Sequence, residues 1–298
     1  MPDQRTITLE DIARGGNLFT WEAHDGAPFP GLSWEPLTGP PRARVLCIHG
    51  LGGAAADFGP LARRLAQDGC AVRAINLRGQ GNDPAHDRRG HFLDPASWRH
   101  DLAAFADSFD GDAPLFVIGE SMGALVAVDA VAHGALRPER LVLSVPVTET
   151  RTPVPAWIVA LLRGAAGVFP RAKLAPMRFV HGKTSIPRLT SDDAYMQYLT
   201  EIPHRVRGFS LEFLTNFHDL MQACRANAAR VRVPTLMLAA GRDVFIRPDQ
   251  SRAFFDSLGA RDKEYLLYPD SHHLLWHDID TGDVLERITR WVLAGRIH

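Results

Sequence analysis

Cysteine is scarce in this 298-residue chain: the three present, Cys47, Cys70 and Cys224, are odd in number and far apart. Most of their neighbours are apolar, so the pattern predicts buried thiols in a reducing compartment rather than a disulfide framework. Long hydrophobic runs are also missing. Nothing approaches the roughly 20 apolar residues of a membrane-spanning helix, and the first residues lack the apolar stretch of a secretion signal. We therefore expect a cytoplasmic protein.

An excess of charge of one sign is absent too. The formal net charge is -1, from 33 Lys and Arg and 34 Asp and Glu. Without a dense basic stripe, nucleic acid is not an expected partner. The adjacent histidines His272 and His273 lack companion ligands at metal-binding spacing, so we expect no metal and no cofactor. Apolar residues are plentiful, at 46% of the chain, which is enough for a substantial core.

Short β-type segments alternate with helical patterns, which is typical of a mostly parallel α/β sheet. An antiparallel hairpin with its turn at Asp25 and Gly26 is predicted over 19–37. The predicted strands that follow are 42–50, 70–79, 113–120, 140–147, 235–241 and 263–269. The predicted helices between and after them are 57–69, 95–109, 121–134, 248–259 and 283–295.

The alternation stops between about Thr148 and Arg230, where the pattern is helical and broken by prolines. Strands from both sides of this gap are needed to complete one sheet. We therefore interpret 148–230 as a helical block, a lid or cap, inserted between two strands. The predicted core consists of 1–147 and 231–298.

A serine between two glycines follows the predicted strand 113–120, where Gly119 to Gly123 reads Gly-Glu-Ser-Met-Gly. On a sharp turn from strand to helix the serine is strained, and larger residues at the glycine positions would clash with neighbouring strands. The hydroxyl then stands at a helix N-terminus, where partial positive charge favours a developing oxyanion. The pattern predicts that Ser121 is a nucleophile.

A serine nucleophile needs a general base, which an acid must orient. On this strand arrangement the order along the chain is serine, acid, histidine. Asp243 follows one predicted strand and a group of histidines follows the next, both at carboxyl ends, where α/β sheets gather functional groups. We prefer Asp243 as the acid to its rivals Asp270 and Asp278. The candidate bases are His272, His273 and His277.

Taken together, these motifs resemble the α/β-hydrolase superfamily and, within it, the monoacylglycerol lipase, lysophospholipase and carboxylesterase group. The matching segments are HGLGG (49–53), NLRGQGND (76–83), GESMG (119–123), GRDVFI (241–246) and SHHLLWHD (271–278). The group commonly has Asp, His and Ser where this chain has Asn76, Gln80 and Asp83. We interpret that segment as a structural turn.

The resemblance implies a role for several residues. The closing motif of the group selects His273 as the base and leaves His272 as its neighbour. The backbone N–H groups of Leu51 and Met122 are implied as the oxyanion hole. His49 is implied as a residue that packs under the loop rather than as a base. Because the nucleophile position holds no Asp, the resemblance does not extend to haloalkane dehalogenases.

The resemblance also predicts the activity: a serine hydrolase that cleaves carboxylic esters through an acyl-enzyme, on medium- or long-chain acyl substrates such as monoacylglycerols or lysophospholipids. One alternative is another acyl-transfer enzyme on this fold, namely a thioesterase, an aminopeptidase or an acyltransferase. A second is a ligand-binding receptor with a slow triad. The apolar segment 153–169 predicts a lid helix packed over the active site, or else an outer face that transiently contacts a membrane or lipid surface.

Overall fold

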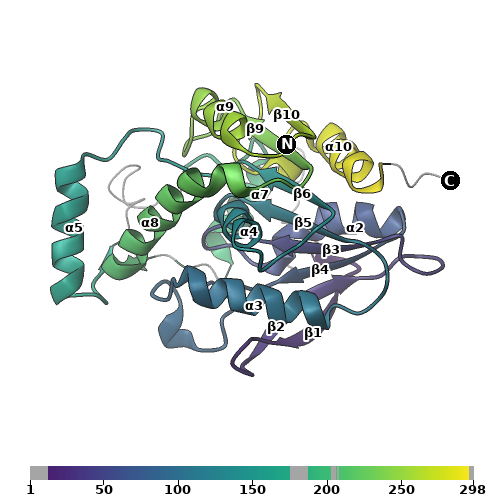
Figure 1. Ribbon diagram of the computed structural model, residues 1–298, viewed down its shortest axis with the longest axis horizontal. Helices are drawn as coiled ribbons and strands as arrows, with labels where there is room; N and C mark the ends of the chain where they lie inside the picture. Colours follow the sequence, from purple (N-terminus) through teal and green to yellow (C-terminus); the bar gives the residue numbers. More distant parts are fainter. Residues whose placement is uncertain (1–12, 175–186, 203–205, 207, 295–298) are drawn as a thin grey trace, which may run out of the picture.

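An eight-stranded sheet forms the centre of the computed structural model, which describes residues 13–174, 187–202, 206 and 208–294 (Figure 1). The strands are β1 (Asn17–Glu22), β2 (Pro28–Trp34), β3 (Ala43–Ile48), β4 (Cys70–Ile75), β5 (Leu115–Glu120), β6 (Arg140–Ser144), β9 (Thr235–Ala240) and β10 (Lys263–Tyr268). Their order across the sheet is β1-β2-β4-β3-β5-β6-β9-β10. The hairpin β1–β2 is antiparallel, β2 is antiparallel to β4, and all pairs from β4 to β10 are parallel. The predicted hairpin and mostly parallel sheet are confirmed.

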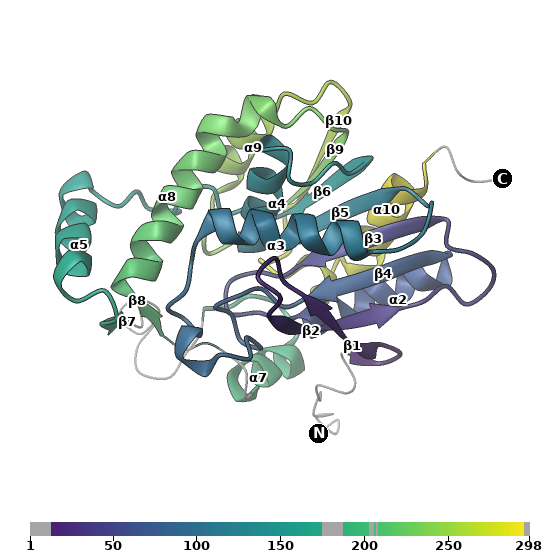
Figure 2. The same ribbon diagram turned by 60° about the horizontal axis from the view of Figure 1, so that its bottom comes forward.

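Helices cover both faces of the sheet, which is why β3 and β9 read as continuous apolar runs rather than alternating ones. The helices of the core are α2 (Gly59–Gln67), α3 (Pro95–Ser108), α4 (Met122–Ala132), α9 (Pro248–Ser257) and α10 (Thr281–Leu293). One buried cluster joins α3, α4 and α9 to one face, and a second joins α2 and α10 to the other. In Figure 2, α3 and α4 lie in front of the strands and α2 and α10 behind them.

The block predicted as an insertion leaves the sheet after β6 and returns at β9, and these two strands are paired neighbours. It contains α5 (Ala156–Val168), β7 (Lys173–Leu174), α7 (Asp193–Glu201), β8 (Phe209–Ser210) and α8 (Leu211–Asn227). The antiparallel ribbon of β7 and β8 was not predicted from the sequence. Strands of two residues are too short to show an alternation of apolar and polar residues in the sequence.

The two longest helices of the block differ in burial. Helix α8 buries Phe213, Leu220 and Met221 in the core, as its apolar spacing predicts. Helix α5 packs against α8 at the edge of the molecule (Figure 1), and none of its residues is buried. The apolar helix is present, as predicted, while its packing over the active site stays a prediction. Its apolar side chains are divided between α8 and the surface.

The three cysteines are buried and free of disulfide bonds, as predicted. Burial raises the pKa of the Cys70 thiol to about 12. Among the helices of the described residues, none is long and apolar enough to cross a bilayer.

Candidate active site

Ser121 occupies the turn between β5 and α4 in a strained conformation, with φ 53° and ψ -116°. A Cβ added at Gly123 would lie 2.0 Å from the carbonyl oxygen of Ile48 on β3, as the motif predicts. A Cβ at Gly119 would lie 2.6 Å from Cα of Ala124, so it would collide with α4 and not with a strand. The two glycines therefore allow the helix to start directly against the sheet.

The loop after β3 runs beside Ser121. A Cβ at Gly50 would lie 3.2 Å from Cβ of Ser121 and 3.7 Å from its Oγ, so a larger residue there would crowd the serine. His49 is fully buried beneath the loop. Its Nδ1 donates to the Gly50 carbonyl at 2.8 Å, and its Nε2 accepts from the Leu77 amide at 3.1 Å. Both ring nitrogens are engaged, which agrees with the structural role predicted for His49.

Two of the residues that depart from the group's pattern support this loop directly. Gln80 accepts a hydrogen bond from the amide of Gly52, and Asn76 accepts one from the amide of Ala55, both at 3.0 Å. The buried Asp83 accepts from the Gly79 amide at 2.6 Å. The segment is a structural turn, as interpreted, but it also fixes the loop next to Ser121. The sequence marked these positions only as departures and did not reveal that contact.

Two backbone amides, one in the loop after β3 and one at the start of α4, have no acceptor among the described residues. Within the described part of the chain, neither the Leu51 amide nor the Met122 amide donates a hydrogen bond to another residue. Met122 is the first residue of α4, where helix geometry leaves the N–H without a partner. Leu51 lies in the loop held by Gln80 and Asn76. Within the described residues, both amides are therefore unengaged.

Asp243 and His273 form a buried pair at the carboxyl ends of β9 and β10. His273 Nδ1 lies 2.7 Å from Asp243 Oδ2. The other carboxylate oxygen of Asp243 accepts the Phe245 amide at 2.8 Å, so the carboxylate is fixed on both sides. The Phe245 ring meets the imidazole edge to face, with centroids 4.7 Å apart. Arg151 donates to the carbonyl of Asp243 at 2.6 Å and ties the loop to the inserted block.

The other two candidate histidines have other partners. His272 Nδ1 lies 3.1 Å from Asp278 Oδ2. His277 donates from Nε2 to the carbonyl of Asp57 at 2.8 Å and stacks on Tyr195. Burial lowers the pKa of His277 to about 4, so its ring is neutral at physiological pH. Neither ring contacts Asp243.

The rival acids are likewise engaged away from His273. Asp270 forms an exposed ion pair with Arg242 at 2.7 Å, and Asp278 pairs with His272.

Ser121 and His273 both follow parallel strands at the same edge of the sheet. Among the described residues, no hydrogen bond joins Ser121 Oγ to His273.

One cluster has the donor set of a metal site. His24, Asp25 and Asp101 place ligand atoms within 4.8 Å of one another. However, the guanidinium of Arg78 binds both carboxylates, at 2.8 Å to Asp25 and 2.9 Å to Asp101. This cation already occupies the space between the two carboxylates and offsets part of their charge, so a metal ion would have to displace it. The arrangement explains a buried arginine rather than a metal centre.

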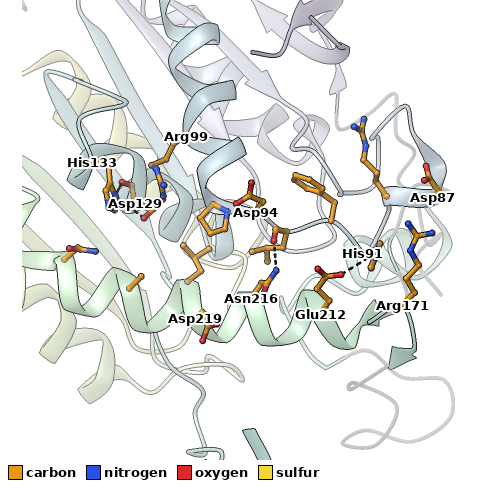
Figure 3. A pocket seen from close by; sticks show the side chains of 17 residues that line it. Asp87, His91, Asp94, Arg99, Asp129, His133, Arg171, Glu212, Asn216 and Asp219 are labelled. Atoms are coloured by element: carbon orange, nitrogen blue, oxygen red, sulfur yellow. Dashed lines mark hydrogen bonds and ion pairs between the residues drawn. The ribbon is translucent and has the colours of Figure 1, made fainter. Parts of the chain in front are cut away.

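A cleft of about 770 Å³ opens between the loop before α3 and helix α8, and Ser121, Asp243 and His273 do not line it (Figure 3). Asp129 and His133 lie at one end and His91 and Arg171 at the other. Many of its charges pair with one another: Arg99 binds Asp129 at 2.6 Å, for example. The lining has more carboxylates than arginines, but pairs such as this one leave few of its charges open to a ligand.

The parallel sheet, the strained serine between β5 and α4, and the acid–histidine pair after β9 and β10 define the α/β-hydrolase fold. The family model described as serine aminopeptidase, S33, matches residues 39–280, and the chain belongs to this family.

Several proteins of similar sequence align with most of this chain. The monoacylglycerol lipase of Mycolicibacterium smegmatis is 24% identical over 267 residues, which span 88% of this chain and 91% of the relative. The human monoglyceride lipase is 24% identical over 273 residues, spanning 87% and 84%.

Solved structures give the same architecture. A monoacylglycerol lipase from Paleococcus ferrophilus superposes with a TM-score of 0.76 at 21% identity, covering 93% of this chain and 99% of the other. A soluble variant of the Saccharomyces cerevisiae monoglyceride lipase, in complex with a substrate analog, gives 0.78 at 22% identity, covering 93% and 94%. At such identities the likeness shows the fold alone.

Proposed function

We propose that this protein is a serine hydrolase that cleaves carboxylic esters through an acyl-enzyme. The observation that carries the proposal is the Asp243–His273 hydrogen bond, which fixes one imidazole, out of three candidates, at the sheet edge where the strained Ser121 stands. The two amides without a protein acceptor complete the set of groups that acyl transfer needs.

In the proposed mechanism each of these groups has a defined role. His273 Nε2 takes the proton of Ser121 as Oγ attacks the ester carbonyl, while Asp243 holds Nδ1 protonated and stabilises the imidazolium. The Leu51 and Met122 amides bind the oxyanion of the tetrahedral intermediate. His273 then protonates the departing alcohol and later activates the water that hydrolyses the acyl-enzyme. The serine–histidine bond forms in the substrate complex, since such bonds commonly tighten only there.

For the substrate we propose a monoacylglycerol or lysophospholipid with a medium or long acyl chain. The names of the relatives support a monoacylglycerol, and so does the apolar composition of the inserted block. In this proposal the core of 1–147 and 231–298 carries the chemistry, and the lid of 148–230 selects the acyl group. The buried thiols favour the cytoplasm.

Helix α5 is the part of the lid that we propose contacts a lipid surface. Trp157 is 68% exposed and Leu161 is 65% exposed, and Phe169 follows at the end of the helix, also exposed. Large apolar side chains exposed together on one helix are a feature of interaction surfaces. Contact with a membrane or lipid aggregate would bury them and bring the lid to its substrate.

The test is hydrolysis of p-nitrophenyl esters from acetate to palmitate, with alanine p-nitroanilide as an amide substrate. We expect turnover to peak at medium or long chains and Ser121→Ala to abolish it. His273→Gln should lower kcat by about 10³-fold or more. The matched control is His272→Gln, which removes a neighbouring imidazole that lacks the Asp243 contact and should change kcat only a few-fold.

Other outcomes would point to the alternatives. Faster cleavage of the anilide than of any ester would favour an aminopeptidase. Fluorophosphonate labelling of Ser121 without ester or amide turnover would indicate an intact nucleophile with another acyl donor, as in a thioesterase or acyltransferase. If the protein shows no turnover and Ser121 is not labelled, the hydrolase proposal is rejected in favour of a receptor.

A further inference from the structure

A buried carboxylate lies beneath the loop that carries Leu51. Asp57 belongs to the short helix η1 (Ala55–Phe58), and its Oδ2 accepts the Ala54 amide at 2.9 Å. A Cβ at Gly53 would lie 2.7 Å from the same oxygen, so the loop closes tightly around this side chain. The position of the Leu51 amide thus depends on where Asp57 is held.

The main chain of Asp57 is held by the segment that follows His273. Its carbonyl accepts hydrogen bonds from Trp276 Nε1 at 3.1 Å and from His277 Nε2 at 2.8 Å, both in the short helix η4 (Leu275–His277). One residue therefore connects the loop of the proposed oxyanion hole to the loop of the proposed base.

Helix α7 of the inserted block reaches the same point through Tyr195. The Tyr195 ring stacks on His277, with centroids 3.8 Å apart and planes 13° from parallel. Its hydroxyl interacts with the side chain of Asp57, and burial together with the charge of Asp57 raises the pKa of this phenol. Tyr195 is almost fully buried, so the contact is shielded from solvent.

Glu120, which precedes Ser121, completes the cluster. Its side chain is 3% exposed, and its Oε1 has no hydrogen-bond partner among the described residues. Burial, and then the charge of Asp57, raise the pKa of Glu120 well above its usual range, which favours the neutral carboxyl. The other titratable groups that interact with Glu120 are Tyr195 and Cys47, and both are also neutral.

We propose that Asp57 and Tyr195 are positioning residues for ester cleavage, which hold helix α7, the Leu51 loop and the His273 loop in one arrangement. The proposal rests on the proposed function, because it concerns the same site. Removal of the Tyr195 hydroxyl removes its interaction with the Asp57 side chain, and the Leu51 loop then loses part of its support. An oxyanion donor acts in the transition state, so kcat should fall while KM stays unchanged.

The experiment compares Tyr195→Phe with Tyr198→Phe, a matched control on the same helix whose buried hydroxyl has no hydrogen-bond partner among the described residues. We expect Tyr195→Phe to lower kcat for a p-nitrophenyl ester about 10- to 100-fold, with KM within twofold of wild type. Tyr198→Phe should stay within twofold in both constants. Asp57→Asn should resemble Tyr195→Phe in kcat.

A second variant separates positioning from stability. Glu120→Gln keeps a neutral side chain of the same size, so it should retain wild-type kcat at pH 7. At alkaline pH, ionised Glu120 would face Asp57 and disturb the cluster, so wild-type kcat should decline there while Glu120→Gln resists the decline. A variant that was only less stable would unfold at a lower temperature, but its kcat at 25 °C would stay at the wild-type value. Lower stability would also not produce the difference in pH profile between wild type and Glu120→Gln.

The rate at which a fluorophosphonate labels Ser121 gives a readout that does not depend on the right ester. Slower labelling of Tyr195→Phe than of Tyr198→Phe supports the proposal even if no ester is turned over, in which case the proposed function fails alone. Equal labelling rates and equal kcat in the two variants would overturn the positioning role while wild-type esterase activity stands. An effect confined to KM would overturn it as well.

Discussion

Helices α5 and α7 belong to the same inserted block, yet the more polar of the two is the one that is buried. Helix α5 is apolar along most of its length and buries no residue. Helix α7 carries acidic and amide side chains, but it packs Tyr195, Tyr198 and Leu199 into the core cluster of α2 and α10. The apolar content of a helix does not by itself determine whether the helix joins the core.

Polar contacts account for the difference. The segment before α7 is bound to the loop after β10: Leu274 donates to the Leu189 carbonyl at 2.9 Å, and Asp278 accepts the Ser191 amide at 2.9 Å. Asp192 then caps α7 through the amides of Ala194 and Tyr195. Helix α5 has Pro155 at its N-cap, where no side chain caps the helix. One helix is therefore part of the rigid site, and the other is a surface.

The largest effect should come from breaking the attachment of α7. The Asp278 carboxylate accepts hydrogen bonds from the Ser191 amide, the Ser191 hydroxyl and the His272 amide. Asp278→Ala removes this acceptor and leaves all three donors without it. We expect unfolding by urea to show a loss of about 4 kcal/mol. The exposed Asp270→Ala serves as the control and should cost less than about 1 kcal/mol. Equal losses would mean that the attachment contributes little.

Acid should weaken the α7 side of the block through His277. Its pKa is 6.5 in the unfolded chain and about 4 when folded, so between these values only the unfolded chain binds the proton. Stability is present above pH 6.5 and is lost as the pH falls towards 4, by about 3 kcal/mol. Urea titrations of wild type and His277→Gln at pH 7 and pH 4.5 would test this. A variant with the same acid sensitivity as wild type contradicts it.

Polar substitution on α5 should separate surface binding from stability. We expect Trp157→Ser with Leu161→Ser to change the free energy of unfolding by no more than about 0.5 kcal/mol, because neither side chain is buried. Binding to phosphatidylcholine vesicles should fall several-fold, while hydrolysis of a soluble short-chain ester stays at the wild-type rate. A matching loss on the soluble ester would instead place α5 in the chemistry.

The smallest effect should come from the ion pair between α5 and α8. Arg163 and Asp219 lie 2.7 Å apart, and both side chains are more than half exposed. Solvent screens such a pair, so Asp219→Asn should alter the free energy of unfolding by less than about 0.5 kcal/mol. A loss well above 1 kcal/mol in urea would show that α5 is more firmly held than its exposure indicates.

Local patterns predicted most of the fold. The strands follow from β-rich apolar runs, and the elbow at Ser121 follows from its two glycines. The choice of His273 as the base came from the resemblance and stays a prediction; of the three candidate rings, His273 is the one that lies against Asp243. Local patterns could not predict the contacts between distant segments. Asp57 and His277 form a hydrogen bond although they are 220 positions apart, and nothing in the sequence around either residue indicates the other.

The adjacency of β6 and β9 has a consequence for the chain during its synthesis. β6 pairs with β5 on one side and with β9 on the other, but the whole inserted block is translated between them. At bacterial and eukaryotic elongation rates this takes on the order of 10 s. For that time β6, with its sequence Arg-Leu-Val-Leu-Ser, is an unprotected edge strand. An unpaired apolar edge of this kind favours aggregation of the nascent protein, and a chaperone that covered it would prevent this.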